Sequence, residues 1–237
     1  MSDLSGKSVL VVGGSSGIGL AVARMAAGDG ASVTIASRSR DRLDAAAAQF
    51  RGEVANRVVD VTDDRSVETV FADLPVFDHV FVTAADVTIK PVREIDMATA
   101  QAAMNSKFWG IFRVARAARI APGGSLGFVS GFRSMRPGPG LALMSAVNGA
   151  IEGLTRGLAL DLRPIRVNAV SPAMVDTPLW SGLDQKAREA MIKRLSQHYP
   201  AGVVGRPQDV AAALLMLAAN PYATGTVMVL DGGASLV

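Results

Sequence analysis

Short apolar runs alternate along the whole chain with longer segments in which apolar residues recur at helical spacing. The short runs are rich in β-branched residues and suit strands that are buried on both faces, as in a parallel sheet. The segments between them are long enough for the helices that connect parallel strands. We expect strands at 7–12, 32–37, 54–59, 77–83, 125–130, 165–170 and 226–230. We expect helices at 20–27, 40–50, 63–72, 96–119, 143–162 and 208–219.

This alternation predicts an α/β fold of the Rossmann type, a doubly wound parallel sheet of seven strands with helices on both faces. No internal repeat or low-complexity linker divides the 237 residues, so one domain spanning 1–237 is expected. Ligands of such sheets bind at the carboxyl ends of the strands. Candidate functional residues are therefore sought at those ends.

Composition excludes several classes of function. The chain has no cysteine, so it has neither a disulfide framework nor a thiolate metal site, and its two histidines lie far apart in sequence. We therefore expect no metal. The net charge of +3 comes from scattered basic residues, which does not suggest nucleic-acid binding. No signal peptide and no apolar run of membrane-spanning length is apparent, so the expectation is a cytoplasmic protein.

A glycine-rich segment, Gly13–Gly19, follows the first expected strand and opens the first expected helix. Gly13 would allow the sharp turn after the strand. Gly17 and Gly19 would allow a phosphate and the neighbouring strand to approach the helix N-terminus closely. Glycine also collects in tight turns of no special function. In this strand–turn–helix context, however, the segment predicts dinucleotide binding.

The Gly-x-x-x-Gly-x-Gly spacing of this segment resembles that of the short-chain dehydrogenase/reductase family, although Val12 stands where the family usually has threonine. The resemblance continues through 166–173, 205–210 and 230–233 and so covers nearly the whole chain. It implies an NADP(H)- or NAD(H)-binding site. The cofactor-binding residues that it implies are Gly13, Ser15, Ser16, Gly17, Ile18, Gly19, Ser37, Arg38, Arg40, Asp60, Val61, Thr83, Ala84, Ala85, Asn148, Pro172, Val175 and Thr177.

The segment after the second expected strand favours NADP(H). Ser37–Arg40 offers two guanidinium groups and two hydroxyls and no acid, which suits a 2′-phosphate better than a ribose diol. The alternative is that Arg38 and Arg40 are solvated loop arginines. Asp60 stands where the family contacts the adenine, and it could instead cap the helix expected near residue 63.

The resemblance fails at the residues that carry the family's redox chemistry. The family uses a tyrosine as proton donor, a lysine four residues later that binds the nicotinamide ribose, and a serine that holds the carbonyl oxygen. The corresponding positions here are Met144, Asn148 and Gly131. Ser130 is the immediate neighbour of the missing serine, and Asn105 matches the family's catalytic asparagine. Asn105 and Ser130 are therefore the candidate catalytic residues.

Other polar residues are expected near the pocket. Arg133 and Arg136 could anchor an anionic substrate or could belong to an ordinary exposed loop. A segment at about 177–200 is expected to form an apolar lid over the substrate, and it ends in the pair His198–Tyr199. A tyrosine or histidine could reach the site only from that pair.

Two functions are compatible with the sequence. The first is an NADP(H)-dependent oxidoreductase that transfers hydride to or from a small carbonyl-type substrate through a non-standard proton relay. The second is a non-redox NADP(H)-binding protein, either a sensor or scaffold or an isomerase or cyclase. The resemblance also implies a homotetramer or homodimer assembled through the two long helices. Some of the bulky apolar groups on these helices must face the sheet; the groups are Phe108, Trp109, Phe112, Leu154 and Leu158.

Overall fold

The computed structural model describes residues 4–84, 88–182 and 184–237. Its described residues form a seven-stranded parallel sheet in the order β3-β2-β1-β4-β5-β6-β7. The strands are β1 (Ser8–Val12), β2 (Ser32–Ser37), β3 (Ala55–Val58), β4 (Phe77–Val82), β5 (Ile120–Val129), β6 (Arg166–Pro172) and β7 (Val227–Leu230). The predicted α/β class, strand number and single-domain Rossmann-like fold are confirmed.

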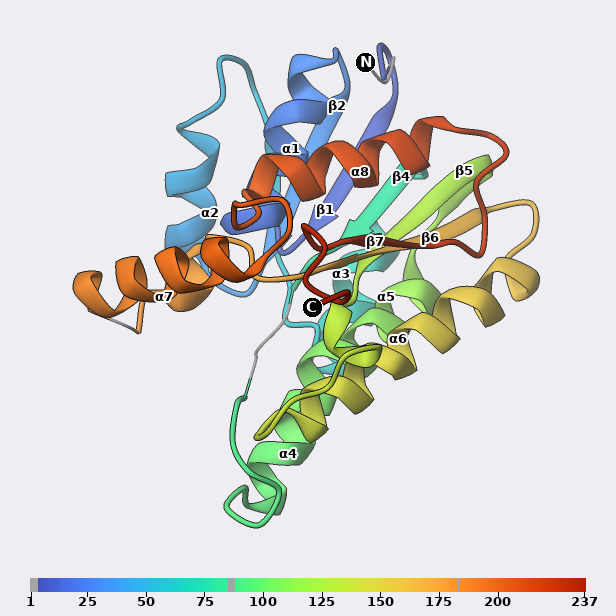
Figure 1. The fold of residues 1–237 in the computed structure, drawn as a ribbon. Coiled ribbons are helices and arrows are strands. Elements are labelled where there is room, and N and C mark those ends of the chain that lie inside the picture. The colour runs from blue at the N-terminus through green and yellow to red at the C-terminus, as the bar shows by residue number, and fades with distance from the viewer. Residues whose placement is uncertain (1–3, 85–87, 183) are drawn as a thin grey trace.

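Helices cover both faces of the sheet (Figure 1). They are α1 (Gly17–Gly28), α2 (Arg40–Ala47), α3 (Asp64–Asp73), α4 (Met97–Met104), α5 (Gly110–Ala117), α6 (Ala142–Asp161), α7 (Gln185–His198) and α8 (Pro207–Ala219). Residues of α1, α2 and α8 pack in one aliphatic core, and residues of α3, α5 and α6 pack in another on the opposite face. A strand that is buried on both faces needs apolar side chains on both faces, and residues 9–12 of β1 are accordingly all apolar and buried.

The strand order reverses between β1 and β4. From β1 the chain adds β2 and β3 on one side, and then β4 to β7 on the other. Val12, the last residue of β1, pairs with Ala36 of β2 and with Val82 of β4. The loops that follow β1 and β4 therefore diverge to opposite sides, which opens a crevice at the carboxyl edge of the sheet.

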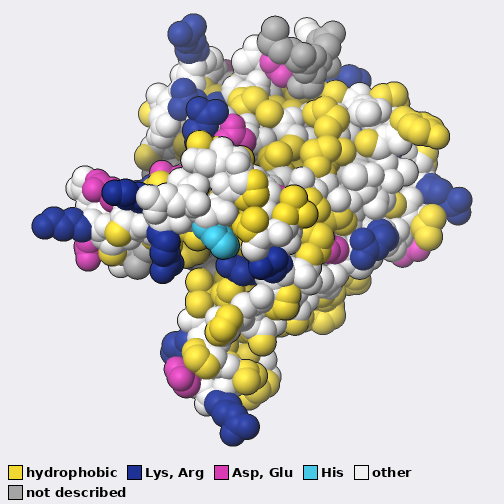
Figure 2. Space-filling view, in the orientation of Figure 1, with side chains coloured by type: hydrophobic (Ala, Val, Ile, Leu, Met, Phe, Trp, Pro, Cys, Tyr) yellow, Lys and Arg dark blue, Asp and Glu magenta, His cyan; other side chains and the backbone are white. Residues whose placement is uncertain are grey.

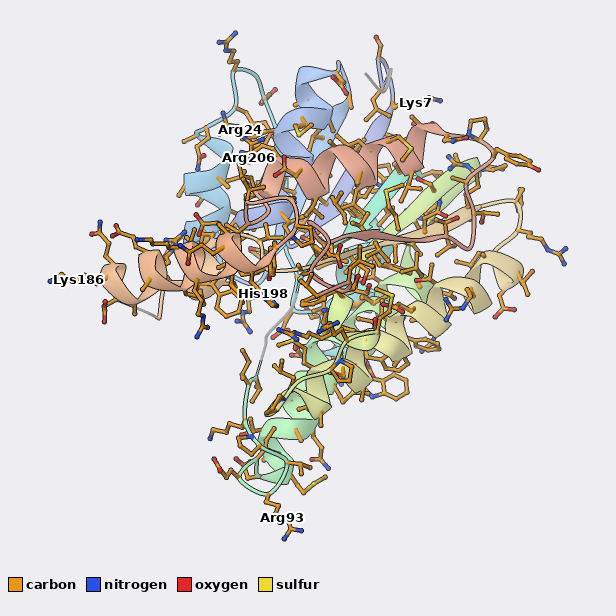
Figure 3. All side chains as sticks on the ribbon, viewed as in Figure 1. Lys7, Arg24, Arg93, Lys186, His198 and Arg206 are labelled. Carbon is orange, nitrogen blue, oxygen red and sulfur yellow. The ribbon has the colours of Figure 1, made fainter. Side chains whose placement is uncertain are left out.

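One expected helix has an internal irregularity. The segment expected as a continuous helix at 96–119 consists of α4, a π-helical turn η1 (Asn105–Trp109) and α5. Asp96 caps the start of α4 through the backbone N–H of Thr99. The α4 end of this long helix stands away from the sheet, and Arg93 lies at its tip (Figures 1 and 3). A π-helical turn adds a residue to the helix, so it changes which side chains face the sheet.

Helix α7 lies in the segment expected to be a lid. Asp184 caps its first turn by accepting a hydrogen bond from the backbone N–H of Ala187. No residue of α7 itself is fully buried, and its outer end, marked by Lys186 in Figure 3, extends away from the body of the molecule. An ion pair between Arg188 and Asp176 ties the helix to the preceding segment, with 2.6 Å between nitrogen and oxygen.

On the face drawn in Figure 2, Lys and Arg side chains lie both around the edge and near the middle, beside a histidine, and they are not gathered into one patch. Among the described residues, no helix is both long and apolar enough to cross a membrane. No cluster of potential metal ligands is found in that part of the chain either.

Candidate functional site

A cavity of about 680 Å³ lies at the carboxyl edge of the sheet. It begins at the glycine turn after β1 and continues past the ends of β4, β5 and β6 to the segment between β6 and α7. Most of the sequence-predicted cofactor residues line it: Gly13, Ser15, Ser16, Gly17, Ile18, Gly19, Arg38, Asp60, Val61, Thr83, Ala84, Asn148, Pro172, Val175 and Thr177. The structure therefore brings these residues, from six separate segments of the sequence, to one cavity.

Two positions of the glycine turn, Gly13 and Gly19, have no room for a side chain. Gly13 has a φ of 88°, and a β-carbon there would lie 2.6 Å from the backbone nitrogen of Ala84. A β-carbon at Gly19 would overlap the carbonyl oxygen of Gly13. The first turn of α1 can therefore lie directly against the end of β1, with its backbone open to the cavity.

The N-terminus of α1 is suited to an anion. Ser16 is the N-cap residue, and its side chain makes no capping hydrogen bond. The first backbone N–H groups of a helix lack intrahelical acceptors and carry the positive end of the helix dipole. Here they adjoin the cavity through Gly17, Ile18 and Gly19. A diphosphate bound in the turn would satisfy them.

Arg38 and Asp60 mark one end of the cavity. Burial alone would raise the pKa of Asp60, but hydrogen bonds from Thr62 and the charges of Arg38 and Arg113 outweigh it, so the pKa is lowered. Asp60 accepts hydrogen bonds from the backbone N–H and the hydroxyl of Thr62, at 2.9 and 2.7 Å. Asp63, rather than Asp60, caps α3. Asp60 is thus fixed as a carboxylate beside Arg38.

Two neighbours of Arg38 that were expected at the cofactor do not line the cavity. Arg40 donates a 2.6 Å hydrogen bond to the side chain of Asn56 on β3, and the hydroxyl of Ser37 is directed to the carbonyl of Ser39. Arg42, which the sequence analysis did not single out, lines the cavity instead. The pair of guanidinium groups at this end is therefore Arg38 and Arg42.

The end of β4 contacts the glycine turn closely. The backbone N–H of Thr83 donates to the carbonyl of Val12 at 2.8 Å, and its hydroxyl also reaches that carbonyl, at 3.2 Å. Thr83 and Ala84 form part of the cavity wall. Ala85, the remaining expected cofactor residue here, lies outside the described residues.

The segment after β6 closes the other end of the cavity. Pro172, Val175 and Thr177 all line it. A β-carbon on Gly17 would lie 3.4 Å from the β-carbon of Thr177, so this segment rests against the glycine turn. The indole N–H of Trp180 donates to the carbonyl of Val175 at 3.1 Å, which holds the ring over the same end.

Apolar groups dominate this closing end. Phe132, Met174 and Tyr199 are buried in a small cluster against which Trp180 and Leu195 pack. All five also line the cavity. Burial, as the main cause, raises the pKa of Tyr199 above its ordinary value. His198 lies beside Tyr199 at the end of α7 (Figure 3) but is not part of the cavity wall.

Arginine side chains are also found at the apolar end. Arg133 lines the cavity, and its guanidinium stacks over the ring of Phe132 at 4.4 Å from the centroid. Arg194, which the sequence analysis did not single out, lines the cavity as well. Arg136 turns away and donates to the carbonyl of Ser235 at 3.2 Å. Of the two arginines expected in the loop after β5, one therefore faces the cavity.

The three positions that the resemblance aligns with the family's serine, tyrosine and lysine come together in the cavity wall. Gly131, Met144 and Asn148 all line it, and Met144 and Asn148 lie one turn apart on α6. A β-carbon on Gly131 would lie 2.8 Å from Nδ2 of Asn148. The Asn148 amide therefore occupies the space that a side chain at position 131 would need.

Asn105 does not reach the cavity. Its amide donates to the backbone carbonyl of Thr62 at 3.1 Å, so it links η1 to the loop after β3. Lys107, two residues later in the π-helical turn, lines the cavity instead. Its Nζ donates to Oδ1 of Asn148 at 2.7 Å and to the carbonyl of Ser130 at 2.9 Å.

Lys107 is the most strongly perturbed basic group of the cavity wall. Its burial lowers the pKa from 10.5 to about 8, although the nearby carboxylate of Glu152 acts in the opposite direction. The ammonium is therefore still mostly charged at neutral pH but close to its titration range.

The hydroxyl of Ser130 is engaged away from the reacting region. It donates to Oε1 of Glu152 at 3.2 Å. The same oxygen accepts hydrogen bonds from the hydroxyls of Ser134 at 2.5 Å and Ser171 at 3.3 Å. Ser130 thus contributes its backbone carbonyl to the surroundings of Lys107, while its side chain belongs to a cluster of three serines around one carboxylate.

A family model described as enoyl-(acyl carrier protein) reductase matches residues 12–235. The chain is 33% identical to the short-chain dehydrogenase/reductase ATR9 of Stachybotrys chlorohalonatus, with all of both chains covered. This chain belongs to the short-chain dehydrogenase/reductase family.

A crystal structure of a small-chain dehydrogenase in complex with NADPH matches with a TM-score of 0.84 and 32% identity, covering 98% of this chain and 100% of that one. The structure of the MalC reductase/Diels-Alderase of Malbranchea aurantiaca matches with a TM-score of 0.92 and 30% identity. The match covers 100% of this chain and 99% of that one.

Sequence reasoning within this family missed Lys107, Arg42 and Arg194. A lysine in a helix of mixed polarity gives no signal of burial, because charged side chains are nearly always exposed. The available signal for Lys107 was its place, two residues after Asn105 and on a helix expected to pack beside Asn148. The π-helical turn that aims it at the cavity has no sequence signature.

Proposed function

We propose that this short-chain dehydrogenase/reductase is an NADP(H)-dependent oxidoreductase that transfers hydride to or from a small carbonyl-type or related substrate without the family's usual proton relay. The observation that carries the proposal is the single continuous cavity. One end is lined by groups that suit a dinucleotide, and the other end is lined by the apolar cluster. A solved relative of similar fold binds NADPH, which supports the choice of cofactor.

The described residues suit the parts of NADP(H) in order along the cavity. Arg38 and Arg42 would hold the 2′-phosphate, and the glycine turn with the start of α1 would hold the diphosphate. Pro172, Val175 and Thr177 would receive the nicotinamide end. Bound there, the cofactor supplies the hydride chemistry, and the protein supplies position and electrostatics.

The proton relay is where this chain departs from the family. Met144 has no titratable group, and Gly131 has no side chain with which to hold a carbonyl oxygen. The nearest tyrosine is Tyr199, but its raised pKa makes it a poor acid at neutral pH. His198 faces outside the cavity wall. Water or the substrate itself would then supply any proton that the reaction needs.

The apolar end indicates the kind of substrate. Phe132, Met174 and Trp180 provide aromatic and thioether surface, and Arg133 and Arg194 provide positive charge at the same end. Such a site suits a largely apolar molecule that carries a carbonyl, imine or conjugated group.

The proposal is tested by NADPH oxidation with a panel of ketones, aldehydes, imines and enones, monitored by nicotinamide absorbance. Turnover with at least one class is expected. Binding of NADPH without turnover of any class would contradict an oxidoreductase. A matched variant for the assay is Arg38→Ala, which should lose NADPH-dependent turnover more than NADH-dependent turnover.

A second candidate function is that of a non-redox NADP(H)-binding protein, acting as a sensor or as an isomerase or cyclase. The observation that favours it is Met144, which has no titratable group at the position aligned with the family's tyrosine. The name of the MalC relative, reductase/Diels-Alderase, shows that a similar protein combines reduction with a cycloaddition. Calorimetric binding of NADPH, together with no consumption of it by any substrate class, would favour this function. Failure to bind NADPH would remove both.

A further inference from the structure

Lys107 is a charged side chain held inside the candidate active site. It is 9% exposed, and its Nζ is fixed by two acceptors, the side chain of Asn148 and the carbonyl of Ser130. These acceptors come from α6 and from the residue that follows β5, so three separate elements converge on one ammonium. Burying a lysine costs free energy unless its charge is compensated. The carboxylate of Glu152 supplies long-range compensation, but no described atom forms an ion pair with Nζ.

The side chain of Asn148 packs between Lys107 and Gly131. The amide of Asn148 presents Oδ1 to Lys107, and its Nδ2 fills the space beside Gly131. A larger residue at 131 would displace the amide, and a lysine at 148 would place two ammonium groups in contact. Position 148, which the resemblance aligns with the family's lysine, is uncharged in this chain. The ammonium beside it belongs to Lys107 of η1 instead.

The ammonium also has a donor to spare. A protonated lysine has three N–H donors. Within the described part of the chain only Asn148 and Ser130 accept from Nζ, and Lys107 belongs to the cavity wall. The third N–H is thus available to a molecule that fills the cavity.

The place of Lys107 along the cavity decides which part of a dinucleotide it would meet. The arginines and Asp60 follow β2 and β3, and the diphosphate turn follows β1. Lys107 lies beside the ends of β5 and α6, on the other side of the strand-order reversal. A dinucleotide laid across the carboxyl edge would bring its second nucleoside there, where the hydroxyls of a ribose are the natural acceptors.

We propose that Lys107, positioned by Asn148, is the cation that binds the nicotinamide ribose of NADP(H), reaching the site from the π-helical turn rather than from position 148. The proposal rests on the NADP(H)-binding function put forward above and names a residue that acts on the nicotinamide half. Asn148 is a positioning residue, since it holds Nζ through Oδ1. Arg38 would act independently on the adenosine half.

The test compares two ligands that share the adenosine half. NADPH contains the nicotinamide ribose, whereas 2′,5′-ADP ends at the adenosine. Affinities for both are measured by calorimetry at pH 7 for the unmodified protein, Lys107→Met and the exchanged variant Lys107→Asn with Asn148→Lys. Lys186→Met, at the exposed outer end of α7, serves as a matched lysine control (Figure 3).

Lys107→Met should weaken NADPH binding about tenfold to a hundredfold, as loss of a hydrogen bond to a charged group does, and leave 2′,5′-ADP binding within about twofold. The exchanged variant should recover most of the NADPH affinity, because it returns one ammonium and one amide to the same place. Arg38→Ala should weaken both ligands. If Lys107→Met does not fold, Lys107→Gln, which keeps a donor without charge, gives the same comparison of NADPH with 2′,5′-ADP.

Two outcomes would overturn the proposal without touching the proposed function. One is equal affinity of Lys107→Met and the unmodified protein for NADPH, and the other is an equal weakening of NADPH and 2′,5′-ADP binding in Lys107→Met. Failure of the unmodified protein to bind either ligand is a different result, and it would overturn the proposed function itself. Because the readout is binding, no substrate needs to be known.

Discussion

A β-carbon on Gly131 would lie 2.8 Å from Nδ2 of Asn148, closer than the two atoms can approach. Asn148 is 2% exposed and is held on its other side by Lys107, so it cannot simply swing away. The absence of a side chain at position 131 and the identity of residue 148 are thus linked by packing.

Gly131→Ser should destabilise the fold by about 1–3 kcal/mol, the usual cost of inserting atoms into a packed site. In a background that carries Asn148→Ala, the same substitution should cost much less, because the amide that it meets is gone. Urea unfolding of the two single variants and the double variant gives the coupling energy. Additive effects would show that the two positions do not contact each other.

Restoring the family's relay requires a change at Lys107. Gly131→Ser, Met144→Tyr and Asn148→Lys together supply a carbonyl donor, a proton donor and its lysine, but they place a second ammonium against Lys107. Adding Lys107→Asn should therefore raise the rate of NADPH-dependent ketone reduction above that of the triple variant. General acid catalysis contributes roughly 100- to 10,000-fold, so the gain should be measurable. A folded, cofactor-binding quadruple variant that remains inert with activated ketones would favour the non-redox function.

Arg38→Ala should weaken NADPH binding by about 1.5–3 kcal/mol and NADH binding far less, because a charge-assisted contact to the 2′-phosphate is lost. Arg40→Ala is the matched control. Its guanidinium is bound to Asn56 outside the cavity, so neither cofactor should be affected. Calorimetric titration of both cofactors into both variants measures these affinities. An equal loss of affinity for NADPH and NADH in Arg38→Ala would show that Arg38 does not bind the 2′-phosphate.

The buried Lys107 should leave a signature in the pH dependence of stability. Its pKa is about 8 in the folded protein against an ordinary 10.5, so between these values the unfolded chain binds more protons than the folded one. The free energy of unfolding of the unmodified protein should therefore rise with pH from about 8 to 10.5, relative to that of Lys107→Met. Chemical unfolding of both proteins across this range measures the difference, which should be flat if Lys107 titrates normally.

The exposed apolar groups on α5 and α6 predict self-association. Trp109, at the junction of η1 and α5, is 46% exposed and makes an edge-on contact with Phe112, while Leu160 on α6 is 65% exposed. Bulky apolar groups in such numbers on neighbouring helices are typical of an interface. Light scattering at micromolar concentration should show a homodimer or homotetramer. Trp109→Glu should shift it toward the monomer, whereas an unmodified protein that is already monomeric would contradict the prediction.

The fold follows almost entirely from the sequence, because burial on both faces of a parallel sheet leaves a strong apolar signal. β2 matches the expected 32–37, and the other expected strands match to within a few residues at most ends. β5 is the main exception. It begins at Ile120 rather than at residue 125, since Ile120 pairs with Phe77 of β4 before a register shift, and the proline and glycines that follow Ile120 disguise the strand. Helix α7 was not expected, because its sequence is polar and its residues are not buried.

Only some residues of the candidate site could be predicted from the sequence. The glycine turn was predictable because only glycine fits its geometry, and Arg38 was predictable from its place after a strand. Arg40 and Arg42 could not be told apart, because which of them faces the cavity depends on the first turn of α2 and on the acceptor that Asn56 offers. Asn105 was expected at the cavity and Lys107 was not singled out, whereas the structure places Lys107 in the cavity wall. A regular helix through 96–119 hides the π-helical turn, and that turn decides which side chain enters the cavity.

The contact between Gly17 and Thr177 has a consequence for the order of events in a catalytic cycle. Thr177 rests against the turn that would receive the diphosphate, and it also begins the segment that encloses the apolar end. A dinucleotide bound in the turn would lie against Thr177 and would form one wall of the space at the apolar end. This arrangement favours a compulsory sequence, with the dinucleotide entering first and leaving last.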